Sequence, residues 1–121
     1  MEGAGRYVLL VDDDPQVRRL LTGALESWGY EVQAVGTGEE ALDRLGHHCP
    51  DVLISDLIMP GISGEELARR CTAQCPATRL VFVSGYGGSD LRELGVTQVV
   101  YLPKPLELAS FRVTLRQLLE G

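Results

Sequence analysis

Hydrophobic residues in this chain occur in two arrangements that alternate from one end to the other. Short unbroken apolar runs are typical of strands buried on both faces, whereas apolar residues that recur every three or four positions are typical of helices with one buried face. Such runs predict strands at residues 7–11, 51–55, 80–84 and 98–102, and a further short strand is predicted at 31–35, which gives five strands in all. The stretches between them have helical spacing, so the chain is expected to alternate strands with helices.

Most of the predicted helices begin with residues that cap helices. Asp14 can cap the first helix, and Pro15 fits its first turn. The sequences TGEE at 37–40 and SGEE at 63–66 are capping-box patterns that predict the start of the second and third helices. The last helix is expected to begin at about Glu107.

The first helix is expected to bury one apolar stripe against the strands. Its apolar residues follow helical spacing at Val17, Leu20, Leu21, Ala24, Leu25 and Trp28. Between the fourth and fifth strands the sequence is less regular, because Gly85, Gly87 and Gly88 cluster where a helix should start. Glycine weakens helices, so that helix is expected to be short and the segment 85–94 mobile.

This alternation predicts a single α/β domain over residues 1–121, with a doubly wound five-stranded parallel sheet covered by helices on both faces. Right-handed crossovers bring the carboxyl ends of all parallel strands to one edge of the sheet. Ligands of such open sheets bind at that edge. The chain ends at Gly121, just after the last predicted helix, so any output is expected to act through a bound partner.

Composition and charge exclude several kinds of partner. The formal net charge is -6 and the chain has no basic stripe, which argues against direct nucleic-acid binding. The apolar runs are too short to span a bilayer, and the first residues lack the apolar core of a signal peptide, so we expect a cytoplasmic protein without direct membrane contact. Three cysteines, Cys49, Cys71 and Cys75, have no spacing typical of a disulfide framework, which fits a reducing compartment.

Polar residues follow four of the predicted strands where those strands end. Asp12 and Asp13 follow the first strand, Asp56 the third, Ser84 ends the fourth and Lys104 follows the fifth. Three carboxylates at one sheet edge form a negative pocket that a hard cation such as Mg²⁺ would neutralise. A carboxylate can attack phosphorus, and a metal, an ammonium and a hydroxyl would stabilise the charge that develops. The sequence therefore predicts a site that accepts a phosphoryl group.

These residues lie in motifs that resemble the receiver domains of two-component response regulators. The motifs read VLLVDDDP, DVLISDLIMPGISG, LVFVSGY and YLPKP, and they span nearly the whole chain in order. The resemblance implies a flavodoxin-like (βα)5 fold with strand order 2-1-3-4-5. The turn sequence SGY also resembles receivers attached to hybrid sensor histidine kinases.

The resemblance implies a role for each acid of the pocket. Asp56 would be the phosphoacceptor, and Asp12 and Asp13 would bind Mg²⁺ together with Asp56 and the backbone carbonyl of Ile58. Asp14 then falls outside the metal pair and is expected to serve only as a helix cap. The isoleucine side chain at position 58 is expected to slow the attack of water on the phosphoryl group.

The same resemblance implies two further functional groups and a switch. Ser84 and Lys104 would contact the phosphoryl group, and Ser84 with Tyr101 would change position on phosphorylation. The Lys104–Pro105 bond resembles one that the family holds cis. The phosphoryl donor would be a phosphohistidine of a sensor histidine kinase or of a histidine phosphotransfer protein. The domain would catalyse only its own phosphorylation and dephosphorylation, and would then change conformation to regulate a partner.

Other interpretations fit parts of the same sequence. A Mg²⁺-dependent phosphatase of the haloacid dehalogenase type would use Asp12 and Asp14 as nucleophile and acid, but no acid pair follows Lys104 and Gln16 interrupts the usual motif. A degenerate receiver that acts without phosphorylation is disfavoured because every expected site residue is present. A zinc site is a further, weaker hypothesis, built on His47, His48, Cys49, Cys71 and Cys75.

Overall fold

The computed structural model describes residue 3 and residues 5–84 and 99–120, which form five strands and four helices. The elements in chain order are β1 (Tyr7–Val11), α1 (Pro15–Ser27), β2 (Glu31–Val35), α2 (Gly38–His47), β3 (Val52–Asp56), α3 (Gly64–Gln74), β4 (Arg79–Ser84), β5 (Val99–Pro103) and α4 (Leu108–Glu120). The short helix and mobile segment expected at 85–94 lie outside the described residues.

The strands form one parallel sheet in the order β2-β1-β3-β4-β5, as the resemblance implied. β1 and β2 have the predicted bounds, whereas β3 and β5 are displaced by one residue and β4 begins one residue earlier. Asp51 precedes β3, and its carboxylate accepts a hydrogen bond from Tyr7 N, at the start of β1, at 2.8 Å. β1 therefore lies inside the sheet, with β3 as its neighbour on the side of the predicted site.

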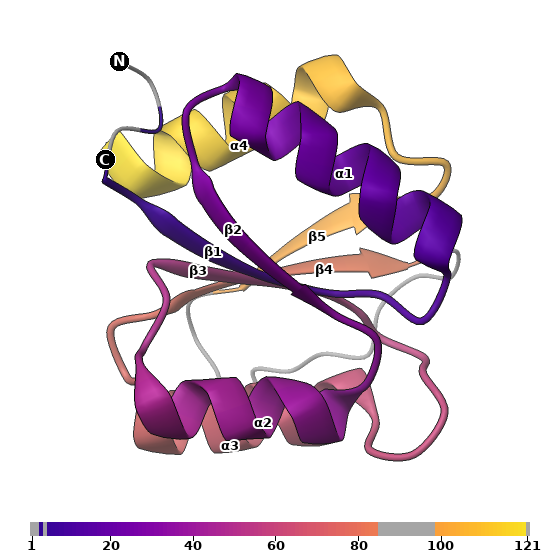
Figure 1. The fold of residues 1–121 in the computed structure, drawn as a ribbon, viewed down its shortest axis with the longest axis vertical. Helices are drawn as coiled ribbons and strands as arrows, with labels where there is room; N and C mark the ends of the chain where they lie inside the picture. The colour runs from indigo at the N-terminus through magenta and orange to yellow at the C-terminus, as the bar shows by residue number, and fades with distance from the viewer. Residues whose placement is uncertain (1–2, 4, 85–98, 121) are drawn as a thin grey trace.

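Of the described helices, α1 and α4 cover one face of the sheet and α2 and α3 cover the other, as Figure 1 shows. Side chains of β1 alternate between the two cores: Leu9 packs with Leu45 and Leu67 of α2 and α3, and Leu10 packs with α1 and α4. β1 and β3 are buried along their whole length, which is the reason these strands read as apolar runs, whereas β2 and β5 at the two edges of the sheet are more exposed. Among the described helices, none combines the length and the apolar composition needed to cross a membrane.

The predicted helix caps are confirmed. The Asp14 carboxylate accepts a hydrogen bond from Gln16 N at 2.9 Å at the start of α1. The hydroxyls of Thr37 and Ser63 accept hydrogen bonds from the backbone nitrogens three residues later, at 3.1 and 3.2 Å. Local sequence therefore determines where three of the four described helices begin.

The predicted stripe of α1 is only partly buried. Leu21 and Leu25 are in the core, but the side chain of Leu20 is 62% exposed and Val17 is also exposed. The buried face of α1 is narrower than the apolar pattern indicated, because α1 contacts the sheet along one side only. The exposed leucine lies next to the functional site described below.

The cysteines differ from expectation, because Cys49 and Cys75 form a disulfide. Their separation of 26 residues has no framework signature, and packing of the end of α3 against the loop before β3 brings them together. Cys71 is free and buried. The zinc hypothesis is wrong, because two of its proposed ligands are bonded to each other.

Candidate functional site

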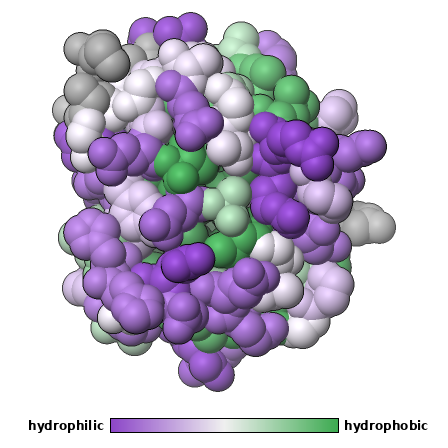
Figure 2. All heavy atoms as spheres, viewed as in Figure 1, coloured by the Kyte–Doolittle hydropathy of each residue, from purple (hydrophilic) through white to green (hydrophobic). Residues whose placement is uncertain are grey.

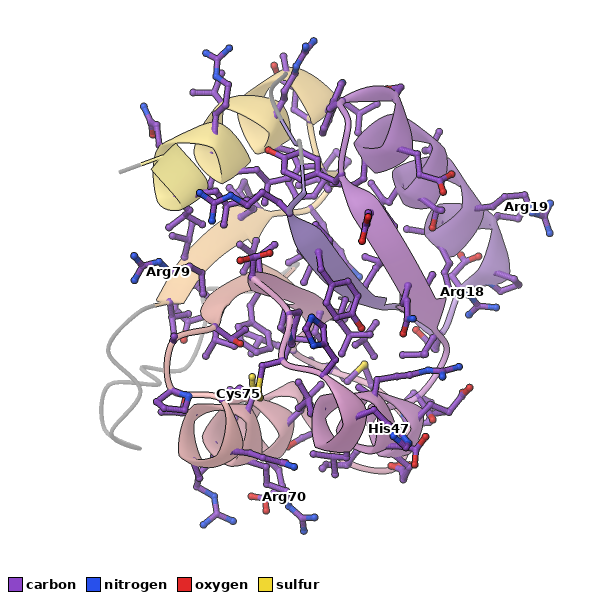
Figure 3. The ribbon with its side chains drawn as sticks, turned by 60° about the vertical axis from the view of Figure 1, so that its left-hand side comes forward. Arg18, Arg19, His47, Arg70, Cys75 and Arg79 are labelled. Atoms are coloured by element: carbon purple, nitrogen blue, oxygen red, sulfur yellow. A yellow bond between two sulfur atoms is a disulfide. The ribbon has the colours of Figure 1, made fainter. Side chains whose placement is uncertain are left out.

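Asp12 lies directly after β1 and is held in place by its neighbours on three sides. Its backbone N–H donates to Val35 O at 3.1 Å, and its carboxylate Oδ1 accepts a hydrogen bond from Asp14 N at 2.9 Å. The guanidinium of Arg18, labelled in Figure 3, donates from Nη1 to the Asp12 carbonyl at 2.7 Å. With only 6% of the residue exposed, Asp12 presents its carboxylate in a fixed position.

Asp56 is the last residue of β3, the strand that pairs with β1. Because these parallel strands end side by side, the carboxylates of Asp12, Asp13 and Asp56 converge, with one oxygen of each within 4.8 Å of the others. Asp56 is as buried as Asp12, whereas Asp13 is exposed. The structure therefore brings together the three acids that the sequence placed at this edge.

Lys104 completes this cluster from the far side of β4. It directly follows β5, and its Nζ lies 3.1 Å from Asp56 Oδ1. The lysine side chain is 50% exposed, so the ammonium has both a solvated approach and a buried carboxylate partner. The Lys104–Pro105 bond is cis, as the resemblance implied.

The electrostatics of the cluster favour a positive partner. Burial raises the pKa of Asp56 above its usual value, although the hydrogen bond from Lys104 lowers it in part, and the charge of Asp13 raises it further. Burial likewise raises the pKa of Asp12, with the backbone N–H of Asp14 opposing and the charges of Asp56 and Asp13 adding to the rise. Among the described residues, the three crowded carboxylates outnumber the two cations that contact these aspartates, Lys104 and Arg18, so net negative charge remains in a partly desolvated place.

The donor set fits a hard divalent cation. Mg²⁺ is bound in proteins by one or two carboxylates, with waters and phosphate oxygens completing its coordination. Asp12, Asp13 and Asp56 offer only oxygen ligands, and at least one of these side chains is open to solvent. Such an ion would offset both the burial and the mutual repulsion that raise the pKa of Asp12 and Asp56.

The acids lie at one end of a larger cavity of about 730 Å³. Its remaining wall is mostly apolar and comes from α1, from the end of β4, and from the segment after β5 together with the first residue of α4. These lining residues are Val17, Leu20, Leu21, Val83, Pro105, Leu106 and Leu108. Figure 2 shows hydrophobic surface in the same region, over α1 beside the beginning of α4.

For the other residues predicted for the site, Ser84, Ile58 and Tyr101, the structure describes a position in the fold rather than a contact with the acidic cluster. Ser84 is the last residue of β4, at the same sheet edge, but its side chain lies outside the described part of the structure. Ile58 follows β3 by two residues and is 72% exposed. Tyr101 lies in β5, partly exposed, with its ring centroid 6.4 Å from that of Phe82. The roles predicted for these three residues stay predictions.

Two contacts of the site region were not foreseen from the sequence. Arg18 bonds the backbone of Asp12, and Glu39 of α2 accepts a hydrogen bond from Ile62 N at 2.9 Å, which ties α2 to the loop after Asp56. Arg18 had a detectable signal, because it lies one helical turn after Asp14 on the helix that leaves the site. Glu39 had none, since its partner lies 23 residues away.

In sequence and in structure, the chain is similar to receiver domains of signalling proteins. A family model described as "Response regulator receiver domain" matches residues 8–116. The response regulator receiver protein CpdR of Brucella abortus is 39% identical over 86 residues, which cover 71% of this chain and 72% of CpdR. The sensor kinase CckA of the same organism is 36% identical over 118 residues, which make up 93% of this chain but only 12% of the kinase. The crystal structure of the receiver domain from hybrid histidine kinase CckA superposes with a TM-score of 0.81 at 34% identity, covering 93% of this chain and 98% of that domain.

Proposed function

The chain belongs to the response regulator receiver family of two-component signalling, and we propose that its Asp56 accepts a phosphoryl group from a phosphohistidine. The donor would be a sensor histidine kinase or a histidine phosphotransfer protein. The observation that carries this proposal is the placement of Lys104 Nζ at 3.1 Å from Asp56 Oδ1, beside two further carboxylates. This arrangement holds one buried nucleophile between a cation and a pair of acids.

The transfer follows from the charges in the pocket. A carboxylate oxygen of Asp56 attacks phosphorus, the phosphorus–nitrogen bond to the donor histidine breaks, and the electron pair of that bond stays on the imidazole. Negative charge then develops on the phosphoryl oxygens, and the ammonium of Lys104 stabilises it without moving far. The Ser84 hydroxyl is proposed as a second donor to these oxygens.

Asp12, Asp13 and Asp56, with the backbone carbonyl of Ile58, are the proposed ligands of Mg²⁺. When bound, the ion supplies the charge that offsets both the carboxylates and the incoming phosphoryl group. The hydrogen bonds from Asp14 N and Arg18 fix the position of Asp12, so the site would need little rearrangement to accept the ion. Ser84 and Tyr101 are the proposed switch residues that respond once Asp56 is modified.

The apolar wall of the cavity supports a protein as the phosphoryl donor. Asp56 is 6% exposed, so a donor histidine must be inserted into the pocket from a partner surface that packs around its mouth. Leu20, Leu106 and Leu108 line the mouth beside the acids, and Leu20 is largely exposed. An apolar helical surface that carries the phosphohistidine would bury these leucines while it places phosphorus at Asp56.

A phosphatase of the haloacid dehalogenase type has no support in the described contacts. In that mechanism Asp14 would act as an acid, but its carboxylate caps α1 through Gln16 N and Val17 N. A receiver that acts without phosphorylation would have no need for the ion pair between Lys104 and Asp56. Of the three hypotheses, only the proposal requires that Asp56 itself becomes phosphorylated.

Intact-mass measurement after incubation with acetyl phosphate and Mg²⁺ tests the proposal directly. The wild-type chain should gain one phosphoryl group, and both Asp56→Asn and removal of Mg²⁺ with a chelator should abolish the gain. Asp51→Asn is the matched control, because this carboxylate lies at the opposite end of β3 and should not affect loading. Loading that persists in Asp56→Asn, or no loading of the folded wild type in any Mg²⁺ concentration, would overturn the proposal.

A further inference from the structure

The disulfide between Cys49 and Cys75 joins two segments at the sheet edge opposite the phosphoacceptor. Cys49 lies in the loop between α2 and β3, and Cys75 is the C-cap of α3. The sulfur–sulfur bond is drawn beside the label of Cys75 in Figure 3. The two sides of the bond differ in access, because Cys49 is exposed whereas Cys75 is only 2% exposed.

Hydrogen bonds hold the same two segments together independently of the disulfide. The Thr78 hydroxyl donates to Pro50 O at 2.7 Å, and Arg79 N donates to Asp51 O at 3.0 Å. The first of these bonds is buried, so water does not compete for it. Opening the disulfide would therefore leave the two cysteines close to each other, at a high effective concentration for closing again.

The third cysteine is not positioned to exchange with this pair. Cys71 is fully buried on α3, and burial raises the pKa of its thiol to about 11, although the neighbouring Thr78 side chain lowers it in part. Since the thiolate is the nucleophile in thiol–disulfide exchange, Cys71 stays protonated and inert near neutral pH. Exchange is thereby restricted to Cys49 and Cys75.

We infer that Cys49–Cys75 is a reversible modification site, at which a low-molecular-weight thiol attacks the sulfur of Cys49, the exposed residue of the pair. In the first step the thiolate forms a bond to Cys49 Sγ, the bond between the two cysteines breaks, and Cys75 leaves as a thiolate that takes a proton from water. A second thiol attacks the outer sulfur of the mixed disulfide and releases Cys49 as a thiolate that is likewise protonated. In total, the protein disulfide and two thiols become a protein dithiol and one small disulfide.

Opening this bond would change the molecule locally. It removes the covalent link between the C-terminal end of α3 and the loop before β3, so both segments fluctuate more about the hydrogen bonds from Thr78 and Arg79 that keep them close, while their core residues stay buried. Asp56 lies at the other end of β3, so its carboxylate cluster is not part of the change. The inference therefore stands apart from the proposed phosphoryl chemistry and is tested without it.

Titration of the folded chain with glutathione buffers tests the inference. The chain is equilibrated at increasing ratios of reduced to oxidised glutathione, quenched with acid, alkylated and analysed by intact mass and peptide mapping. We expect conversion to a dithiol without denaturant, a mixed disulfide on Cys49 at intermediate ratios, and full reclosure in oxidised glutathione. Hydrogen exchange should rise in the segments 48–51 and 74–79 and stay unchanged in β1.

The variant Cys71→Ser is the matched control and should titrate as the wild type does. The inference is overturned if the bond opens only after unfolding in guanidinium, if oxidised glutathione fails to close it in the folded chain, or if the mixed disulfide forms on Cys75 or Cys71. Opening without any rise in exchange at 48–51 and 74–79 would overturn the local change in structure.

Discussion

Asp13 is the exposed member of the acidic cluster, yet its charge acts on both buried members. It contributes to the raised pKa of Asp12 and to that of Asp56. A carboxyl whose pKa is raised by folding adds stability when protonated. That stability is fully present below the ordinary Asp pKa and is lost as the pH rises through the raised value. At neutral pH without a metal ion, the cluster therefore destabilises the fold.

Replacing Asp13 by asparagine should stabilise the metal-free protein at neutral pH. Removing one repulsive charge at the edge of the cluster is expected to raise the free energy of unfolding by up to about 1 kcal/mol, and the gain should shrink as the pH falls through the raised pKa of Asp12 and Asp56. Urea unfolding with a chelator present measures this change. Added Mg²⁺ should raise Tm in the wild type and much less in Asp13→Asn.

The control for this prediction is Asp43→Asn, an exposed carboxylate paired with His47 on α2 and remote from the cluster. It should leave both the metal-free stability and the response to Mg²⁺ near those of the wild type. Loss of stability in metal-free Asp13→Asn would mean that the carboxylates do not repel one another as their pKa directions indicate.

Helix α2 positions the loop that follows Asp56, although the two are far apart in sequence. Glu39 accepts a hydrogen bond from Ile62 N, and a Cβ on Gly38 would collide with Cγ2 of Ile62. Gly61, in the same loop, has a φ of 77°, a conformation that glycine adopts without strain. The pattern TGEE identified the start of the helix correctly, but it gave no indication that Glu39 accepts a hydrogen bond from the loop after Asp56.

Glu39→Ala should loosen this loop without unfolding α2. The amide of Ile62 loses its acceptor, so its hydrogen exchange is expected to accelerate about tenfold, while amides in the last turn of α2 keep their protection. Exchange measured residue by residue by NMR gives the comparison. Glu40→Ala, at the neighbouring position on the same helix, should leave Ile62 unchanged. Equal acceleration in both variants would show that the helix start has frayed rather than that one contact was lost.

Helix α1 has an exposed apolar side chain where the proposed donor would bind. Leu20→Ser should alter stability by less than about 0.5 kcal/mol, because the side chain is 62% exposed. Phosphotransfer from a phosphorylated histidine kinase that loads the wild type is expected to slow at least about tenfold, while loading from acetyl phosphate stays the same. Val113→Ser, an exposed apolar residue of α4 outside the cavity wall, is the control. Equal losses with both donors would place the effect in the pocket and contradict a docking role.

The parts of this molecule that local sequence determines are those that could be predicted. The positions of the buried strands, the helix caps and the polar residues at strand ends follow from residues close together in the chain. The convergence of Asp12, Asp56 and Lys104 follows from the handedness of parallel crossovers. Contacts between segments far apart in the chain have no local sequence pattern that would predict them. The exposure of Leu20 depends on how α1 packs against the sheet. It could not be predicted, because apolar spacing alone does not distinguish a helix face buried in the core from an exposed binding surface.

The disulfide is a covalent contact between two segments far apart in the sequence, and it restricts the conformations of the unfolded chain. A bond that closes a separation of 26 residues removes loop entropy worth about 3.5 kcal/mol in the chain-entropy description. Cys49→Ser should therefore lower the free energy of unfolding of the oxidised chain by about 3 kcal/mol, since Cys49 is exposed and its replacement leaves no cavity.

Urea unfolding of both proteins, with and without a reducing thiol, isolates this effect from any defect in the native state. In the oxidised state the wild type should unfold at the higher urea concentration, and in the reduced state the two curves should coincide. Cys71→Ser carries the same chemical change at a buried position outside the bond, so its loss of stability should persist in reductant. A Cys49→Ser chain as stable as the oxidised wild type would mean that the hydrogen bonds from Thr78 and Arg79 already restrict these segments in the unfolded ensemble.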